Sequence, residues 1–137
     1  MPKLFFILLI IFPVATLADH LEFDNAWIRN LPPTVMARAG YVSINNPGSE
    51  AVSILSVTSD AFKKIEIHQT IMKDGLMSME PVANVTIEPN SQLILKPGGM
   101  HLMMMHTTES TSPGDKIRIT IELSNGSKQS LVFTVKK

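Results

Sequence analysis

The chain has 137 residues, of which 45% are hydrophobic and 18% are charged, so it can bury one substantial core and is not a disordered chain. Its 12 basic residues balance its 12 acidic residues, which leaves no positive excess for binding nucleic acid. It contains no cysteine, and this excludes disulfides, zinc–thiolate sites, iron–sulfur clusters and the cysteine-ligated blue-copper centre. Nine methionines and four histidines are the unusual part of the composition.

The first 18 residues have the features of an export signal. Lys3 supplies a positive end, an apolar run of nine residues extends over Leu4–Phe12, and small residues lead to a cut after Ala18. This run is far shorter than the ~20 residues of a membrane-spanning helix. We therefore expect residues 1–18 to be a signal peptide and residues 19–137 to be a single domain. We expect no permanent membrane anchor and, because no cysteine follows the cut, no lipid anchor.

Beyond the leader, turn signals separate short runs in which apolar and polar residues alternate, which is typical of strands with one wet face. A helical turn is expected at Ser59–Lys64, where Ser59 and Asp60 could cap it. In chain order, we predict strands at Glu22–Arg29, Arg38–Asn45, Ala51–Thr58, Ile65–Gln69, Met77–Ile87, Gln92–Leu95 and Met100–His106.

The clearest predicted strand is Lys116–Leu123, in which every second residue is apolar. The sequence Asn125-Gly126 is typical of a tight hairpin turn, because both residues tolerate positive φ. Eight or nine short strands with frequent turns predict an all-β domain, either a β-sandwich or a small Greek-key barrel. The residues expected to face the core from the last two strands are Ile117, Ile119, Ile121, Leu123, Leu131, Phe133 and Val135.

Methionine and histidine concentrate in one part of the sequence. Six of the nine methionines lie between Met77 and Met105, and three of the four histidines lie in or beside this stretch. Strand alternation places His101 and Met103 on one face, about 6.7 Å apart along the strand. Met77 shares a face with Met79 in the same way. On the preceding strand, His68 should point away from the core if Ile65 and Ile67 face it.

Two histidines and two methionines would form a neutral set of donors with soft sulfur. Such a set suits Cu(I) far better than Mg, Ca or Zn, since zinc favours thiolate, carboxylate or three histidines. Methionine does not titrate, so acid would remove only the histidines from the set. The alternative is structural, because methionine also fills irregular gaps in cores and Met100 to Met105 could do this between two sheets. Spacing alone favours copper and leaves both interpretations open.

The residues also resemble a known family, the periplasmic copper chaperones of PCu(A)C type. His68, Met79, His101 and Met103 reproduce its H-x10-M-x21-H-x-M pattern with all three spacings kept. The resemblance covers essentially the whole chain after the leader. Further landmarks are Ala26-Trp27-Ile28-Arg29, Ala39-Gly40-Tyr41 followed by Asn45-Asn46, Glu66-Ile67-His68, Pro97-Gly98-Gly99-Met100 and Gly114-Asp115.

This resemblance implies a cupredoxin-like Greek-key β-barrel with a Cu(I) site near the solvent. The ligands it implies are His68, Met79, His101 and Met103. It also implies a periplasmic chaperone that passes copper to accepting proteins, and we expect this chaperone to be a monomer. The acceptors would be the copper centres of cytochrome c oxidase or a thiol-containing assembly factor. Some members carry a His/Met-rich C-terminal extension for a second copper ion, and the sequence ending in Thr134-Val135-Lys136-Lys137 has none.

Other methionines and histidines receive weaker assignments. Met77 and Met105 share the parity of the proposed ligands and could help in copper transfer, although packing is the preferred interpretation for them. Met104 and His106 lie outside the motif. His20 could bind Cu(II) weakly beside a new amino terminus. Trp27 and Arg29 are expected to be structural, with Trp27 in the core.

Several other functions compete with copper delivery. Copper sequestration would use the same site chemistry, and a metal-free β-sandwich interaction module would use methionine only for packing. An electron-transfer cupredoxin is disfavoured because it needs a cysteine ligand. An enzyme is not expected, since the sequence presents no paired carboxylates, Ser–His arrangement or phosphate loop.

Overall fold

The computed structural model describes residues 10–11 and 20–137, so most of the expected leader lies outside the described residues. Within the described part, all regular structure is β-strand, and no helix is present that could cross a membrane. The ten strands are β1 (Glu22–Arg29), β2 (Ala37–Asn46), β3 (Val52–Ser59), β4 (Phe62–Lys73), β5 (Leu76–Pro81), β6 (Val85–Ile87), β7 (Ser91–Leu95), β8 (His101–Thr107), β9 (Lys116–Leu123) and β10 (Lys128–Lys136).

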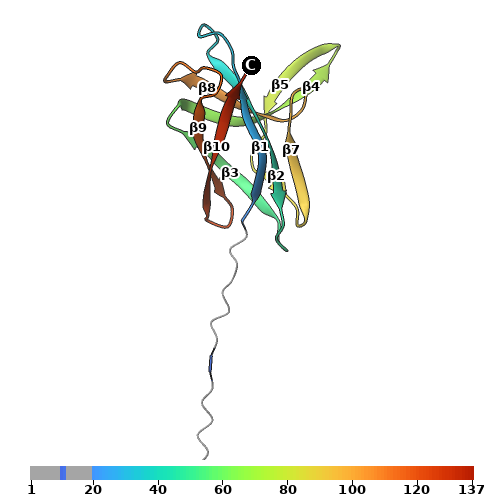
Figure 1. Ribbon diagram of the computed structural model, residues 1–137. Coiled ribbons are helices and arrows are strands. Elements are labelled where there is room, and N and C mark those ends of the chain that lie inside the picture. Colours follow the sequence, from blue (N-terminus) through green and yellow to red (C-terminus); the bar gives the residue numbers. More distant parts are fainter. Residues whose placement is uncertain (1–9, 12–19) are drawn as a thin grey trace, which may run out of the picture.

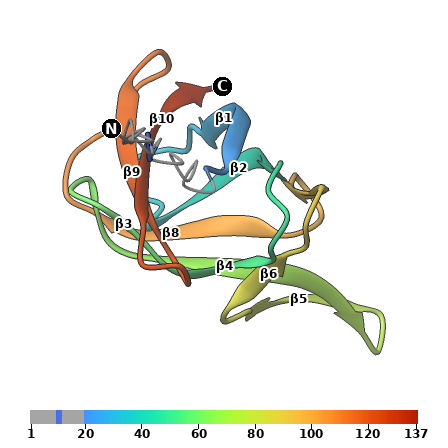
Figure 2. The same cartoon turned by 90° about the horizontal axis from the view of Figure 1, so that it is seen from below.

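Seven of these strands close into a barrel in the order β4-β8-β2-β1-β10-β9-β3, with β3 pairing back to β4. Only the β1–β10 pair is parallel among the pairings of the barrel. The other three strands lie outside this ring: β5 pairs with the outer part of β4, β6 pairs with β3, and β7 pairs with β2. Figure 2 looks along the barrel and shows β5 beyond the ring. The predicted all-β class is thus confirmed, and a barrel replaces the alternative of a sandwich.

The interior of the barrel is filled by the alternating apolar residues that the sequence marks. On β9 and β10, Ile119, Ile121, Phe133 and Val135 are at most 1% exposed, as predicted. From β8, Met104 is completely buried and joins this core. One methionine of the Met100–Met105 run therefore does fill the core, as the structural alternative proposed for the whole run.

Two local predictions were wrong. Ser59–Lys64 is not a helical turn: β3 ends at Ser59, a tight turn follows at residues 60–61, and β4 begins at Phe62. The Ser59 hydroxyl does cap that turn, since it accepts a hydrogen bond from the Ala61 amide at 3.3 Å. The predicted strand Met77–Ile87 is two strands, β5 and β6, because the chain leaves the sheet after Pro81. This division raises the number of strands from the expected eight or nine to ten.

Trp27 is half-buried on the outside of the barrel and does not lie in the core. Ile28, its neighbour, occupies the interior with no exposed surface. The register of β1 shifts between Asp24 and Trp27, where Asn25 adopts a φ of 53°. Trp27 then stacks on Tyr41 of β2, with 4.6 Å between the ring centroids.

The β4–β5 hairpin projects from the barrel and carries part of the candidate site (Figure 1). Its turn is Asp74-Gly75, and both residues have positive φ, at 53° and 75°. Such a turn matches the right-handed twist of the strands it joins. All six residues of β5 are exposed, so this strand is held by its pairing with β4 and not by burial.

Candidate metal centre

The pairing of β4 with β8 places the two candidate histidines side by side. His68 and His101 are direct partners in this antiparallel register, so both side chains point to the same face of the sheet. Their ring centroids are 6.1 Å apart. His101 is only 4% exposed, and the side chain of His68 is 13% exposed. Ile65 and Ile67 are buried on the opposite face of β4, as the sequence pattern predicted.

One nitrogen of each imidazole is held by a group that can only accept a hydrogen bond. His68 Nε2 lies 2.8 Å from Glu66 Oε2, and His101 Nδ1 lies 3.1 Å from the carbonyl oxygen of Gly99. In the neutral ring each of these nitrogens must therefore carry the proton. The other nitrogens, His68 Nδ1 and His101 Nε2, then carry no proton and each has a free lone pair. Both are buried without a hydrogen-bond partner.

Two buried, unpartnered imidazole lone pairs on adjacent rings are an unusual and costly arrangement for a protein interior. It is the arrangement that a metal ion requires, because a ligating histidine binds through one nitrogen and is oriented through the other. The residues present therefore fit a metal ion that accepts nitrogen donors.

The candidate methionines lie on the same face as the histidines, on either side of His68. Met103 of β8 is half-buried opposite Glu66, one diagonal step from His68. Met79 of β5 lies opposite Thr70, which is also one diagonal step from His68, and is 52% exposed. Diagonal neighbours in a sheet are about 7–8 Å apart, within reach of long side chains. The register thus brings all four predicted residues to one face of β5, β4 and β8.

The methionines and histidines that received weaker assignments from the sequence divide into three groups. Met77 and Met105 share the outer face with the candidate ligands, one on β5 and the other on β8. Met104 points into the core. His106 is exposed at the far end of β8 with a φ of 54°, and His20 is exposed before β1.

Glu66 contacts both the candidate ligand His68 and the exposed side chain of Lys64. Its Oε1 atom accepts from Lys64 Nζ at 2.6 Å while Oε2 accepts from His68. The hydrogen bonds from Lys64 and then His68 lower the pKa of Glu66 below its ordinary value of 4.5. The carboxylate is therefore ionised at neutral pH and fixes the orientation of the His68 ring.

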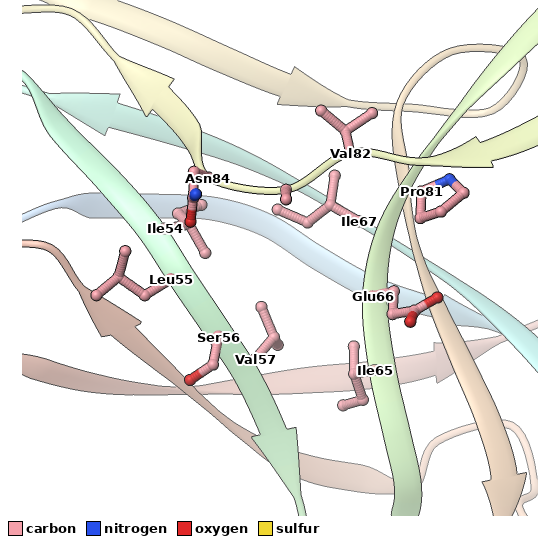
Figure 3. Close-up of a pocket in the computed structure, with 11 residues that line it drawn as sticks. Ile54, Leu55, Ser56, Val57, Ile65, Glu66, Ile67, Pro81, Val82 and Asn84 are labelled. Carbon is pink, nitrogen blue, oxygen red and sulfur yellow. The ribbon is translucent and has the colours of Figure 1, made fainter.

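The candidate centre holds two histidines, and the described residues contain no cluster of three or more histidine, cysteine, aspartate or glutamate side chains suited to a metal. It is also not a deep cavity. The pocket shown in Figure 3 lies between β3 and β4 under the segment from Pro81 to Asn84. Glu66 reaches its lining, but none of the four candidate ligands does.

Sequence reasoning missed two orienting groups, Glu66 and the Gly99 carbonyl. The signal for Glu66 was present, since a residue two positions before His68 on a strand must lie beside it. The sequence contains no pattern that indicates that the Gly99 carbonyl faces the His101 ring.

Comparison with known proteins places this chain in a family. It matches the family described as "Putative lipoprotein LpqE-like" over residues 21–135. The chain belongs to the LpqE-like family. A curated relative of the LpqE-like chain is "Putative lipoprotein Lxx21020" of Leifsonia xyli subsp. xyli, 31% identical over 120 residues that cover 87% of this chain and 71% of the relative. Another is RP573 of Rickettsia prowazekii, 30% identical over 72% of this chain and 57% of that protein.

Solved structures with the same fold include copper proteins. The LpqE-like barrel superposes on the copper-bound PCuAC domain from PmoF2 with a TM-score of 0.72 and 16% identity, covering 87% of this chain and 95% of that domain. It superposes on the Cu(I) form of DR1885 from Deinococcus radiodurans with a TM-score of 0.67 and 23% identity, covering 82% and 76%. These likenesses establish the PCuAC fold for the LpqE-like chain, as the resemblance of its motif predicted.

Proposed function

We propose that this protein is a carrier that binds Cu(I) reversibly at His68, Met79, His101 and Met103. The observation that carries the proposal is the pair of bare, buried imidazole nitrogens on His68 and His101. Met79 and Met103, each a diagonal neighbour of His68, add two thioethers on the same face. This set of two neutral nitrogens and two neutral sulfurs suits Cu(I) best among the common biological metals.

The donor set supports transport better than permanent storage. Thioethers are weak donors and the sequence has no thiolate to hold the ion, so an acceptor with cysteine ligands can win it by affinity. Met79 is 52% exposed, which lets such an acceptor approach one side of the bound ion. The protein performs no reaction on a substrate in this proposal, and it acts as a monomer without nucleic acid.

We also propose a compartment and copper-accepting partners for this carrier. The leader-like residues 1–18 and the family description as lipoproteins both support export, and we place the protein in the periplasm. We propose that its acceptors are copper-binding proteins of respiratory assembly, either a cytochrome c oxidase subunit or a thiol-containing assembly factor. A transfer assay with a purified oxidase copper domain tests this choice of acceptor directly.

Copper sequestration is a second candidate, because the site chemistry would be the same. It differs in the fate of the ion: a sequestering protein keeps Cu(I) when a thiol-bearing acceptor is added, and a carrier gives it up. A metal-free interaction module is the third candidate. Its melting temperature would be indifferent to Cu(I), whereas a ligand that binds only the folded state raises it.

The test is an anaerobic titration of the protein with Cu(I) against a chromophoric chelator. We expect one tightly held equivalent that is weakened at least about tenfold, or about 1.4 kcal/mol, in His101→Ala. His106→Ala is the matched control, since His106 lies on the same strand but at its exposed far end. Equal Cu(I) affinity of the two variants, or no competition by the wild type, would refute the proposed site.

A further inference from the structure

The β4–β5 hairpin carries an unexplained group of exposed methionines. Met72 is 66% exposed, Met77 is 69% exposed and Met79 is 52% exposed. Exposed strand positions more often hold threonine, lysine or glutamate, which remain hydrated at no cost. Three large apolar side chains at exposed positions of this hairpin therefore need a physical reason.

The register places these three side chains together. Met72 pairs directly with Met77, and Met79 is the next residue of β5 on the same face. Directly opposite residues have Cβ atoms about 4.5–5.5 Å apart, and alternate residues on a strand are about 6.7 Å apart. Methionine is unbranched and flexible, so the three sulfurs can turn toward one ion between them.

These methionines belong to an uncharged strip of residues on one face of the hairpin, and this strip extends to the candidate centre. From the tip, its paired positions are Met72 with Met77, Thr70 with Met79, and His68 with Pro81. Of the charged residues between His68 and Pro81, Lys73 and Glu80 alternate onto the other face, as their pairing with Leu76 and Gln69 shows. The third, Asp74, lies in the turn at the tip. A soft cation on this strip would meet sulfur first and then imidazole nitrogen, with no repelling ammonium on the way.

We propose that Met72, Met77 and Met79 form a second, weaker Cu(I) site that passes the ion to and from the His68–His101 centre. Three thioethers select Cu(I) over harder cations for the same reason as the main centre does. Met79 belongs to both sites, so the ion can move by exchanging Met72 and Met77 for His68 and His101. This inference rests on the proposed function, because a relay needs a centre to serve.

The experiment uses Ag(I), a soft cation of the same charge that resists redox change, and protein labelled at the methionine ε-methyl groups. The first equivalent should shift the methyl signals of Met79 and Met103. Because Met79 then already binds the first ion, further Ag(I) should bind Met72 and Met77 through their two sulfurs and shift their methyl signals, while Met36 stays unmoved. Met36 is 58% exposed outside the hairpin and reports on unspecific sulfur binding.

The decisive variant is Met72→Leu/Met77→Leu, which removes the sulfur but keeps the apolar surface. It should weaken the second equivalent at least about tenfold, slow the loading of the first equivalent from a Cu(I)–chelator complex, and leave the affinity of the first equivalent unchanged. Met36→Leu should alter none of these quantities. A second equivalent that is equally strong in both variants, or that is absent from the wild type, would overturn the relay.

The outcomes separate the relay from the main centre. If the first equivalent is absent from the wild type, the proposed function fails, and the relay fails with it. If the first equivalent is normal and Met72 and Met77 do not respond, only the relay fails. Unchanged loading in the double variant would show that the sulfurs of Met72 and Met77 take no part in loading, which also contradicts the proposal.

Discussion

Glu66 gives the sharpest test of the candidate centre, because it touches the proposed ligand His68 without contacting the ion. Its carboxylate holds the proton on His68 Nε2 through one bond of 2.8 Å and so presents the bare Nδ1. Removing such an orienting partner from a metal ligand weakens metal binding by about 10- to 100-fold. We expect Glu66→Ala to approach the upper value, since the ring can then rotate or change its tautomer.

Glu66→Gln should have a smaller effect. The amide oxygen of glutamine can still accept a hydrogen bond from Nε2, so the tautomer is kept and only the negative charge is lost. We expect Cu(I) to bind about tenfold more weakly, equivalent to about 1.4 kcal/mol. The measurement is the same anaerobic chelator competition, together with a thermal melt of the metal-free protein to show that folding is intact.

Lys64→Gln is the matched control, because Lys64 binds the other oxygen of the same carboxylate. Its side chain is 62% exposed, and exposed ion pairs contribute at most about 1 kcal/mol. We expect its Cu(I) affinity to equal that of the wild type or to exceed it slightly, since Glu66 then serves His68 alone. The reasoning would be refuted if Lys64→Gln weakens Cu(I) as much as Glu66→Gln does, or if Glu66→Ala binds normally.

Three further predictions follow from burial, backbone geometry and charge. Met104→Ala should lower the free energy of unfolding by about 2–5 kcal/mol in urea and leave the Cu(I) affinity unchanged. Met103→Leu should weaken Cu(I) binding and leave the free energy of unfolding nearly unchanged. Equal effects of the two variants on both quantities would contradict the faces assigned to these residues. Gly75→Ala should strain the hairpin turn by about 1–2 kcal/mol, seen as faster amide exchange at the tip and unaltered exchange in β9. Because the pKa of Glu66 is lowered from 4.5, its ionised form stabilises the fold above that pH and the contribution is lost on acidification. The melting temperatures of wild type and Glu66→Gln should therefore converge as the pH falls from 4.5 through the lowered pKa of Glu66, and a constant difference would argue against this assignment.

Much of the barrel could be predicted because one face of each strand is buried. β1 and β9 have the predicted ends, and the isoleucines of β9 face the core as their alternation requires. The projecting hairpin was harder to predict, since β4 runs from Phe62 to Lys73, well beyond the predicted Ile65–Gln69. Its second strand, β5, is exposed along its whole length and so carries no burial pattern, and the Asp74-Gly75 turn is the clearest sequence signal of the hairpin.

The candidate centre was predictable in composition but not in geometry. Alternation alone indicates that His101 and Met103 share a face, because both lie on one strand. That His68 stands opposite His101 depends on the pairing of β4 with β8, which the sequence does not encode locally. The prediction that Trp27 lies in the core was wrong for a related reason. A bulge at Asn25 changes which residues of β1 face inward, and the alternation of apolar and polar residues does not indicate this bulge.

Burial sets Met79 apart from the other three candidate ligands, since His68 and His101 are nearly covered and Met103 is half-buried. His101 and His68 are almost covered, and each ring is anchored through its second nitrogen, so these two donors cannot leave without breaking a hydrogen bond. Met79 is exposed on a hairpin that the core does not hold. A bound Cu(I) ion would therefore lose its contact with Met79 first, and an acceptor would approach from the β5 side. This asymmetry reconciles the two demands on a carrier, because the buried imidazoles supply affinity while the exposed thioether supplies a route for release.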